Sequence, residues 1–336
     1  MSPPAVYHGG DLGAARALFP DAPLPWLDLS TGINALAYPI GTISTEAWTR
    51  LPDAGAVAAL EAAAAVAYGA PVGQIVAAPG TQALIQALPR LLPARSAAIL
   101  GVTYAEHERV WRESGAQTQI VDDLSALARA DVAVVVNPNN PDGRRVPVEA
   151  LTEIVATLAG KGGTLVVDEA FADVLPSAAS LAPRLPETGA VVLRSFGKAY
   201  GLAGLRLGFA IGSPQFTGRL RAALGPWAIT GPAAEIGARA LADRDWLART
   251  SERLRADAAR LDTLLTRAGL RVVGGAPLFR LTESSDAARV FRRLGEAGVL
   301  VRPFPARPGW LRFGIPGEAK DWARLERALK CAALWL

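Results

Sequence analysis

Residues 194–208 read RSFGKAYGLAGLRLG, and this stretch decides how the rest of the chain is interpreted. Lys198 lies there among small residues, between two apolar runs, and Arg206 follows eight positions later. An amine that attacks a carbonyl carbon must be partly desolvated and close to compensating groups, because it has to be neutral when it attacks. Ser195 and Arg206 add hydrogen-bond donors that suit a phosphate dianion. The stretch therefore predicts a nucleophilic lysine beside a phosphate site.

The composition leaves few alternatives to this lysine. The 336 residues include only four lysines. We expect the other three to lie in a loop or on a polar helix face and to be solvated charges: Lys161, Lys320 and Lys330. The net charge is +4 and the pI is near 9.5. The basic residues are nevertheless scattered and form no run interleaved with aromatic residues, so we expect no nucleic-acid partner.

Other broad features favour a cytoplasmic protein. No apolar run approaches the about 18 residues that a membrane span needs, so we expect no membrane partner. The opening MSPPAVYHGGDLG lacks the basic-then-apolar layout of a secretory signal. Cys331 is the one cysteine, which excludes an internal disulfide and favours a reducing compartment. No residue is assigned to a metal ion.

Helical and strand-like segments alternate between about residue 54 and residue 212. This alternation predicts an α/β fold with a mostly parallel central sheet. The expected strands are 96–100, 131–137, 164–170, 190–195 and 207–212, and the expected helices are 54–69, 81–92, 104–114 and 148–159. We expect Gly69 to end the first of these helices, and Pro89 to kink or interrupt the second.

From about residue 214 the pattern changes to that of a smaller α+β domain. Long helical patterns come first, then strands expected at 270–273, 277–282 and 310–315, and helices at 286–297 and 318–333. The expected organisation has three parts: an N-terminal segment over the active site (1–35), a large domain (36–225) and a small C-terminal domain (226–336).

Three further motifs accompany the lysine. The sequence PGTQ at 79–82 opens a helix with Gly80 and Thr81, whose free N–H groups suit a phosphate, although Thr81 is an equally good cap without any ligand. The sequence NPNNPDG at 137–143 follows a strand, where ligands of α/β sheets bind, although a plain connecting turn has the same pattern. In VVDEAF, Asp168 ends a buried strand; either a protonated pyridine nitrogen or a capping role would suit its carboxylate.

In this order and spacing, the four motifs resemble the fold-type I pyridoxal 5′-phosphate enzymes, the class I and II aminotransferases and their relatives. The resemblance covers nearly the whole chain and implies the aminotransferase-like fold with pyridoxal 5′-phosphate as cofactor. It implies that Lys198 binds the cofactor covalently and moves protons. It also implies roles for the other cofactor residues: Asp168 pairs with the ring nitrogen, Asn140 bonds the phenolic oxygen, Tyr104 stacks on the ring, and Gly80, Thr81, Ser195 and Arg206 hold the phosphate. Gln82 is a further residue expected to bind the cofactor.

The N-terminal sequences YHGGDLGAAR and LDLSTGINALAYP resemble the branch of this family that decarboxylates a phosphorylated amino acid. The alternative is an aminotransferase of the kind that acts on histidinol phosphate. Phe171 supports the decarboxylating branch, because many aminotransferases have a tyrosine at this position. The resemblance implies substrate contacts by five residues, with Arg312 on the α-carboxylate: His8, Gly9, Asn34, Arg302 and Arg312. It also implies a homodimer, although Leu51 replaces a tyrosine that relatives send into the partner's site, and Ala35 replaces a proline.

Two alternatives from other classes are weaker. A non-catalytic cofactor-binding module of a regulator would need an attached DNA-binding segment, and no helix-turn-helix pattern precedes residue 40. A nicotinamide-dependent dehydrogenase would need a G-x-G-x-x-G motif after an early strand, and none follows the first strands. We therefore expect a pyridoxal phosphate enzyme.

Overall fold

The structure is a computed structural model that describes residues 9–333. Contacts within the chain divide it into two compact units. Unit 1 consists of Met1–Ala37, Pro141–Gly143 and Arg249–Leu336, and unit 2 consists of Tyr38–Asn140 and Arg144–Ala248. Unit 2 contains one sheet and unit 1 contains two.

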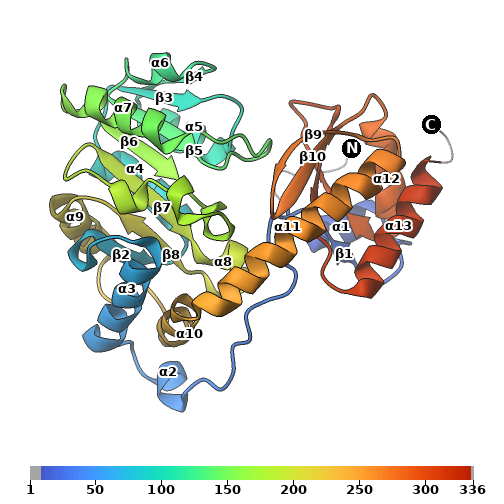
Figure 1. Cartoon of the computed structure of the whole chain (residues 1–336), viewed down its shortest axis with the longest axis horizontal. Helices are drawn as coiled ribbons and strands as arrows, with labels where there is room; N and C mark the ends of the chain where they lie inside the picture. The colour runs from blue at the N-terminus through green and yellow to red at the C-terminus, as the bar shows by residue number, and fades with distance from the viewer. Residues whose placement is uncertain (1–8, 334–336) are drawn as a thin grey trace. The chain divides into compact units, whose positions relative to one another are not determined.

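Unit 2 contains a seven-stranded sheet in the order β2-β8-β7-β6-β5-β3-β4 (Figure 1). The strands are β2 (Ile75–Ala78), β3 (Ser96–Leu100), β4 (Gln117–Val121), β5 (Val132–Val136), β6 (Thr164–Asp168), β7 (Ala190–Ser195) and β8 (Gly208–Ile211). Strands β3 to β7 pair in parallel, and β8 pairs antiparallel with both β7 and β2. The prediction of an α/β fold with a mostly parallel sheet is therefore confirmed.

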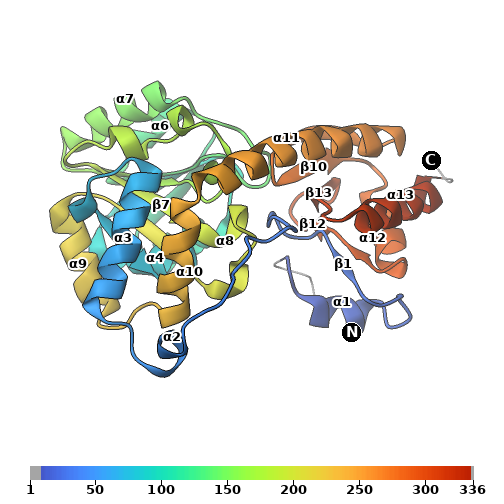
Figure 2. The same cartoon turned by 60° about the horizontal axis from the view of Figure 1, so that its bottom comes forward.

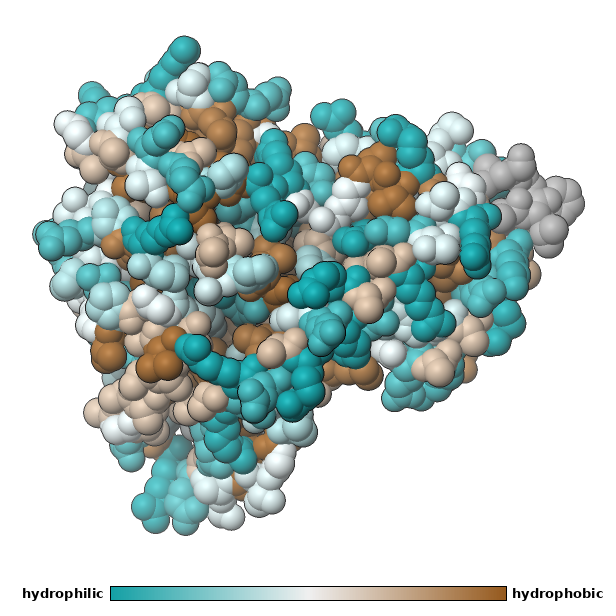
Figure 3. Space-filling model, in the orientation of Figure 1, coloured by the Kyte–Doolittle hydropathy of each residue, from teal (hydrophilic) through white to brown (hydrophobic). Residues whose placement is uncertain are grey.

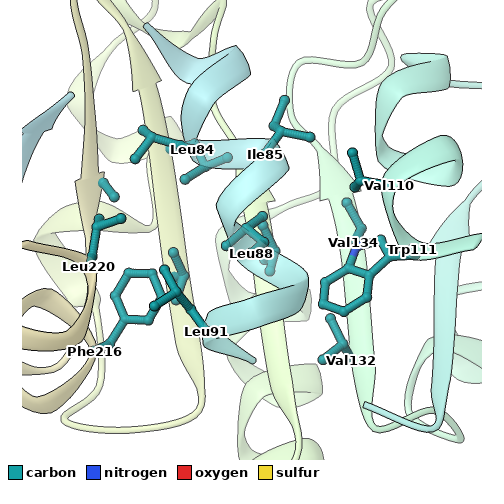
Figure 4. Close-up of a cluster of buried hydrophobic side chains, with 14 of the residues drawn as sticks. Leu84, Ile85, Leu88, Leu91, Val110, Trp111, Val132, Val134, Phe216 and Leu220 are labelled. Atoms are coloured by element: carbon teal, nitrogen blue, oxygen red, sulfur yellow. The ribbon is translucent and has the colours of Figure 1, made fainter. Parts of the chain in front are cut away.

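Helices cover both faces of this sheet. Their apolar sides and the strands form a core cluster on one face (Figure 4), where α4 contributes Leu84, Ile85, Leu88 and Leu91, α5 contributes Trp111 and α9 contributes Phe216. The other face is covered by α7, which contacts β6, and by α3, which contacts β2 and α10. The helices of unit 2 are α2 (Thr45–Thr49), α3 (Ala54–Tyr68), α4 (Thr81–Leu91), α5 (Ala105–Glu113), α6 (Leu124–Leu127), α7 (Val148–Ala159), α8 (Phe196–Ala199), α9 (Pro214–Leu224) and α10 (Gly231–Ala242).

Local signals account for several element boundaries. Gly69 ends α3 in the left-handed conformation, with φ of 68°, as predicted. Pro89 lies inside α4, which continues to Leu91, so the proline does not interrupt this helix. Strand β4 was not predicted, because it lies at the sheet edge with exposed and half-buried residues and so has no apolar run. Short 3₁₀ turns occur at η1 (Val72–Gln74), η2 (Ala172–Val174), η3 (Ser177–Ala179), η4 (Ala182–Arg184) and η5 (Ala203–Leu205).

Unit 1 combines a four-stranded antiparallel sheet, in the order β12-β13-β10-β9, with a two-stranded parallel sheet of β1 and β11 (Figure 2). Its strands are β1 (Leu27–Asp28), β9 (Arg271–Ala276), β10 (Phe279–Glu283), β11 (Val299–Leu300), β12 (Arg302–Pro303) and β13 (Trp310–Gly314). Its helices are α1 (Leu12–Leu18), α12 (Ala287–Glu296), α13 (Ala319–Ala333) and most of α11 (Arg244–Arg267). The small α+β unit thus has the predicted kinds of elements.

The division of the chain differs from the expected one in three ways. The N-terminal segment belongs to unit 1, because β1 pairs with β11. Helix α10 belongs to unit 2, because it packs on α3, so the later boundary falls at Arg249 and not at 226. A short piece of the loop after β5, Pro141–Gly143, also belongs to unit 1, since the N–H group of Gly275 donates to the carbonyl of Asp142 at 2.7 Å.

The surface carries no broad apolar band in the view of Figure 3, where hydrophobic residues lie in small groups among hydrophilic ones. Among the described residues, no helix has the length and apolar character that crossing a bilayer requires.

Candidate active site

The first helix turn of α4 and Arg206 together form an anion-binding corner in unit 2. Gly80 precedes α4 with φ of +82°, and no side chain caps the helix. A Cβ atom on Gly80 would lie 2.9 Å from Nη2 of Arg206, and one on Gly208 would lie 2.8 Å from the backbone N of Thr81. These glycines therefore let the guanidinium and a neighbouring strand approach the helix N-terminus closely. Uncapped N–H groups beside an arginine suit a phosphate.

Arg206 itself has the left-handed backbone conformation, with φ of 53°. A non-glycine residue held there costs about 1–3 kcal/mol and is often found at functional sites. Its Nη1 atom donates to the carbonyl of Ala203 at 3.3 Å, which helps to orient the guanidinium.

Asp168 ends β6 and is held by a histidine that the sequence analysis did not single out. Its Oδ2 atom lies 2.9 Å from Nε2 of His107, and its Oδ1 atom accepts from the N–H of Ala170 at 3.1 Å. Both side chains are buried, and Nδ1 of His107 has no hydrogen-bond partner within residues 9–333. The contact fixes the direction of the carboxylate. His107 lies three positions after Tyr104 on α5, and this helical spacing was the available signal.

Tyr104 stands directly before α5 and is tied to two other side chains. Its hydroxyl donates to Oε1 of Gln82 at 3.1 Å, and Nε2 of Gln82 donates to Oε2 of Glu106 at 2.5 Å. Glu106 also forms an ion pair with Arg109 at 2.6 Å. This chain of contacts orients the aromatic ring and holds Gln82 beside Tyr104.

Lys198 lies in α8, which begins directly after Ser195 ends β7. Its Nζ atom lies 5.7 Å from the ring centre of Phe171, and the residue is half-buried. Ser195 is buried, and its side chain does not cap α8. The amine is therefore partly desolvated beside an aromatic face, as the nucleophilic role requires.

Asn140 is buried in the loop between β5 and α7. Its neighbour Asn139 anchors the loop, because it accepts a hydrogen bond from the Thr103 hydroxyl at 2.6 Å and donates to the Val102 carbonyl at 2.9 Å. The loop is thereby joined to the segment before Tyr104. All nine predicted cofactor residues thus lie in unit 2, along the edge where the parallel strands end.

The predicted substrate residues that the structure describes lie in unit 1. Arg312 on β13 and Arg302 on β12 are directly opposite each other in the antiparallel ladder. Burial of Arg312, and secondly the charge of Arg302, lower the pKa of Arg312 to about 9, against a smaller opposing effect of Asp28. Two like charges face each other here, which favours an anion between or beside them.

Gly9 is brought close to this arginine pair. Nη2 of Arg312 donates to the Ser30 carbonyl at 2.8 Å, and a Cβ atom on Gly9 would lie 2.3 Å from that same oxygen. Asn34 is buried, and its Oδ1 atom accepts from Nη2 of Arg253 at 2.7 Å, so part of its hydrogen-bonding capacity is used within unit 1. His8 lies outside the described residues.

The residues of unit 2 fit a phosphorylated pyridine aldehyde. The uncapped helix with Arg206 suits the phosphate, the buried carboxylate of Asp168 suits a protonated ring nitrogen, and the amine of Lys198 suits the aldehyde carbon. Glu169 directly follows Asp168, and Arg194 directly precedes Ser195. These two residues form a buried ion pair that was not predicted from the sequence.

Comparisons with known proteins identify the family to which the chain belongs. The threonine-phosphate decarboxylase of Pseudomonas aeruginosa is 42% identical over 326 residues, covering 96% of each chain. That of a Sinorhizobium species is 42% identical over 331 residues, covering 98% of each. The histidinol-phosphate aminotransferase of Sinorhizobium meliloti, solved in complex with pyridoxal 5′-phosphate, has a similar fold: the TM-score is 0.82 at 22% identity, over 96% of this chain and 94% of that one. The sequence model of a protein family, aminotransferase class I and II, matches residues 31–329, so the chain belongs to this family.

Proposed function

We propose that the protein decarboxylates L-threonine O-3-phosphate to (R)-1-aminopropan-2-yl phosphate, a precursor in cobalamin biosynthesis. The bond from Cα to the carboxylate breaks, carbon dioxide leaves, and a proton replaces it on Cα. Pyridoxal 5′-phosphate is the cofactor, and it supplies the electron sink for this bond cleavage. The two relatives at 42% identity are both named threonine-phosphate decarboxylase, which supports this substrate.

The observation that carries the proposal is the opposed pair Arg302 and Arg312. The substrate has two anionic groups, a carboxylate and a phosphate, and two guanidinium groups on paired strands match that charge. A bound anionic group would also offset the unfavourable burial of Arg312, whose pKa is lowered to about 9. We assign the α-carboxylate to Arg312 and the phosphate to Arg302, with Gly9, Asn34 and His8 completing the enclosure.

In unit 2, each residue has a separate task in the proposed reaction. Asp168, oriented by His107, keeps the ring nitrogen protonated. Lys198 would hold the aldehyde carbon of the cofactor before substrate binds and, once displaced by the substrate amine, would deliver the proton to Cα. Tyr104 supports the ring, and Asn140 hydrogen-bonds the phenolic oxygen.

Transamination is the second candidate, because the same residues also suit that reaction. With the cofactor bound, the outcome would depend on which bond of the substrate Cα the surrounding residues hold perpendicular to the cofactor ring, because that bond would be the one weakened. A decarboxylase presents the carboxylate in that position, and an aminotransferase presents the hydrogen. The fold similarity to a histidinol-phosphate aminotransferase makes this the alternative to test.

A homodimer is part of the proposal. Three large apolar side chains on one part of unit 2 are 60% exposed or more: Trp48, Leu51 and Trp227. Trp48 lies on α2, Leu51 follows α2, and Trp227 precedes α10 in the chain. Figures 1 and 2 both place α2 beside α10, and Ser44 Oγ donates to Glu235 Oε2 at 2.7 Å to join these helices. We call these three residues the apolar patch, and a second copy of the chain is its proposed partner. The single cysteine supports a cytoplasmic location.

The decisive experiment gives the purified holoenzyme L-threonine phosphate and follows carbon dioxide release and 2-oxoglutarate consumption together. Carbon dioxide release without oxoglutarate consumption, lost in Lys198→Ala, supports the decarboxylase. Amino transfer to oxoglutarate, or turnover of histidinol phosphate with none of threonine phosphate, rejects it in favour of the aminotransferase.

A further inference from the structure

A buried ion pair joins the ends of β6 and β7 on the face opposite to the cofactor residues. Successive side chains of a strand point to opposite faces. The residues two positions before Asp168 and Ser195 belong to the core cluster, so these two point to that face. Glu169 and Arg194, one position away from each, point to the other face, and Nη1 of Arg194 lies 2.7 Å from Oε2 of Glu169.

Both oxygens of the Glu169 carboxylate are held by donors. Oε2 accepts from the Ser180 hydroxyl at 2.5 Å as well as from Arg194, and Oε1 accepts from the N–H of Leu181 at 2.7 Å. Glu169 has no exposed surface, and Arg194 is 5% exposed. A shift of one strand end would pull these two buried charges apart, which is unfavourable in a site that excludes water. The ion pair therefore holds the two strand ends at one separation.

A second carboxyl group, that of Asp173, accepts from Nη2 of Arg194. Burial raises the pKa of Asp173, although Arg194 opposes this. Burial alone would lower the pKa of Arg194, but Asp173 and Glu169 raise it above its ordinary value. One guanidinium thus serves two carboxyl groups, those of Glu169 and Asp173. A neutral amide in place of the Asp173 carboxyl group would keep the hydrogen bond to Arg194.

We infer that Arg194 and Glu169 are positioning residues for the cofactor: their ion pair holds Asp168 and the turn that carries Lys198 at the separation that the bound cofactor needs. Asp168 must meet the ring nitrogen while Lys198 reaches the aldehyde carbon on the opposite side of the same rigid ring. A displacement of about 1 Å at such a site can lower a rate about 100-fold. The inference rests on the cofactor assignment of the proposed function, but not on the choice of substrate.

The test compares Glu169→Gln and Arg194→Lys with the matched variant Asp173→Asn. Three properties are measured: the dissociation constant of pyridoxal 5′-phosphate, the visible circular-dichroism band of the bound cofactor, and kcat and KM for threonine phosphate. We expect Glu169→Gln and Arg194→Lys to weaken cofactor binding about 10-fold or more and to change the band. We also expect them to lower kcat about 10-fold with KM nearly constant, whereas Asp173→Asn keeps the parent's band and affinity.

A purely structural role would give a different result. Glu61→Gln is the control for lost stability, because it breaks the ion pair of buried Glu61 with Arg221 (2.6 Å) and should lower Tm without changing the band. If Glu169→Gln and Arg194→Lys behave like this control, with the parent's band and cofactor affinity, the inference is wrong. Failure of the parent protein to bind pyridoxal 5′-phosphate would instead reject the proposed function.

Discussion

Replacing Arg312 with methionine should make the free protein more stable and unable to bind its substrate. A pKa of about 9 in place of 12.5 corresponds to about 5 kcal/mol of unfavourable free energy for the buried charge. Methionine is long and flexible enough to occupy much of the same volume. It would leave the Ser30 carbonyl without the 2.8 Å bond, which costs about 1–3 kcal/mol. It would also lose the contact with the Phe279 ring, 5.2 Å away.

The net gain is about 2 kcal/mol, or roughly 3 °C in Tm for a chain of this length. Differential scanning calorimetry of parent and variant at pH 7 measures it. The stability difference between parent and variant should also depend on pH. Because folding lowers the pKa of Arg312, the destabilisation by its charge is fully present below about pH 9 and is lost as the pH rises towards 12.5. The variant's advantage should therefore be about 1 kcal/mol smaller at pH 10 than at pH 7.

Arg280→Met is the matched control in the same unit, because Arg280 forms an ion pair with Asp262 at 2.7 Å. We expect this control to lower Tm and leave the KM for threonine phosphate close to that of the parent. A Tm that falls by several degrees in Arg312→Met, or an undiminished advantage at pH 10, would refute the claim that the Arg312 charge destabilises the free protein.

Three further predictions concern other parts of the molecule. Lys198→Ala should fold but release no carbon dioxide, and mass spectrometry after borohydride treatment should find no covalently bound cofactor; release by this variant would assign the chemistry to another residue. His107→Leu should lower kcat about 10- to 100-fold, because Asp168 loses its orienting partner, and unchanged kinetics would contradict this. Trp48→Glu should yield monomers in size-exclusion chromatography with light scattering, since it places a charge in the apolar patch; an intact dimer would locate the interface elsewhere.

The predictable parts of the fold are those with a local signal. The buried strands β6 and β7 are apolar runs with clear ends, and Gly69 is a glycine at a position that requires positive φ. The edge strand β4 has no such run, because one edge of it faces no neighbour and its side chains are largely exposed. Strands β1 and β11 are two residues long each and pair across most of the chain, so no local pattern could reveal them.

The candidate site shows the same division. Gly80, Asp168 and Lys198 stand at the junctions of strands with helices or loops, where sequence motifs are easily recognised. His107 and the Arg194–Glu169 pair act through contacts between elements that are far apart in the chain. A histidine inside a helix has an ordinary core role in most proteins, so its contact with Asp168 emerges only when α5 packs on the sheet.

The pairing of β1 with β11 has a consequence for the order in which a newly made chain can fold. Leu27 and Asp28 leave the ribosome early, but their partners Val299 and Leu300 are made 272 residues later. At the usual speed of synthesis this delay is roughly 15–55 s. Unit 2 ends at Ala248 and can be complete before then, whereas unit 1 waits for the last part of the message. A chain truncated after residue 248 would thus contain all of unit 2 but would have an N-terminal strand without its partner, a state that chaperones would have to protect.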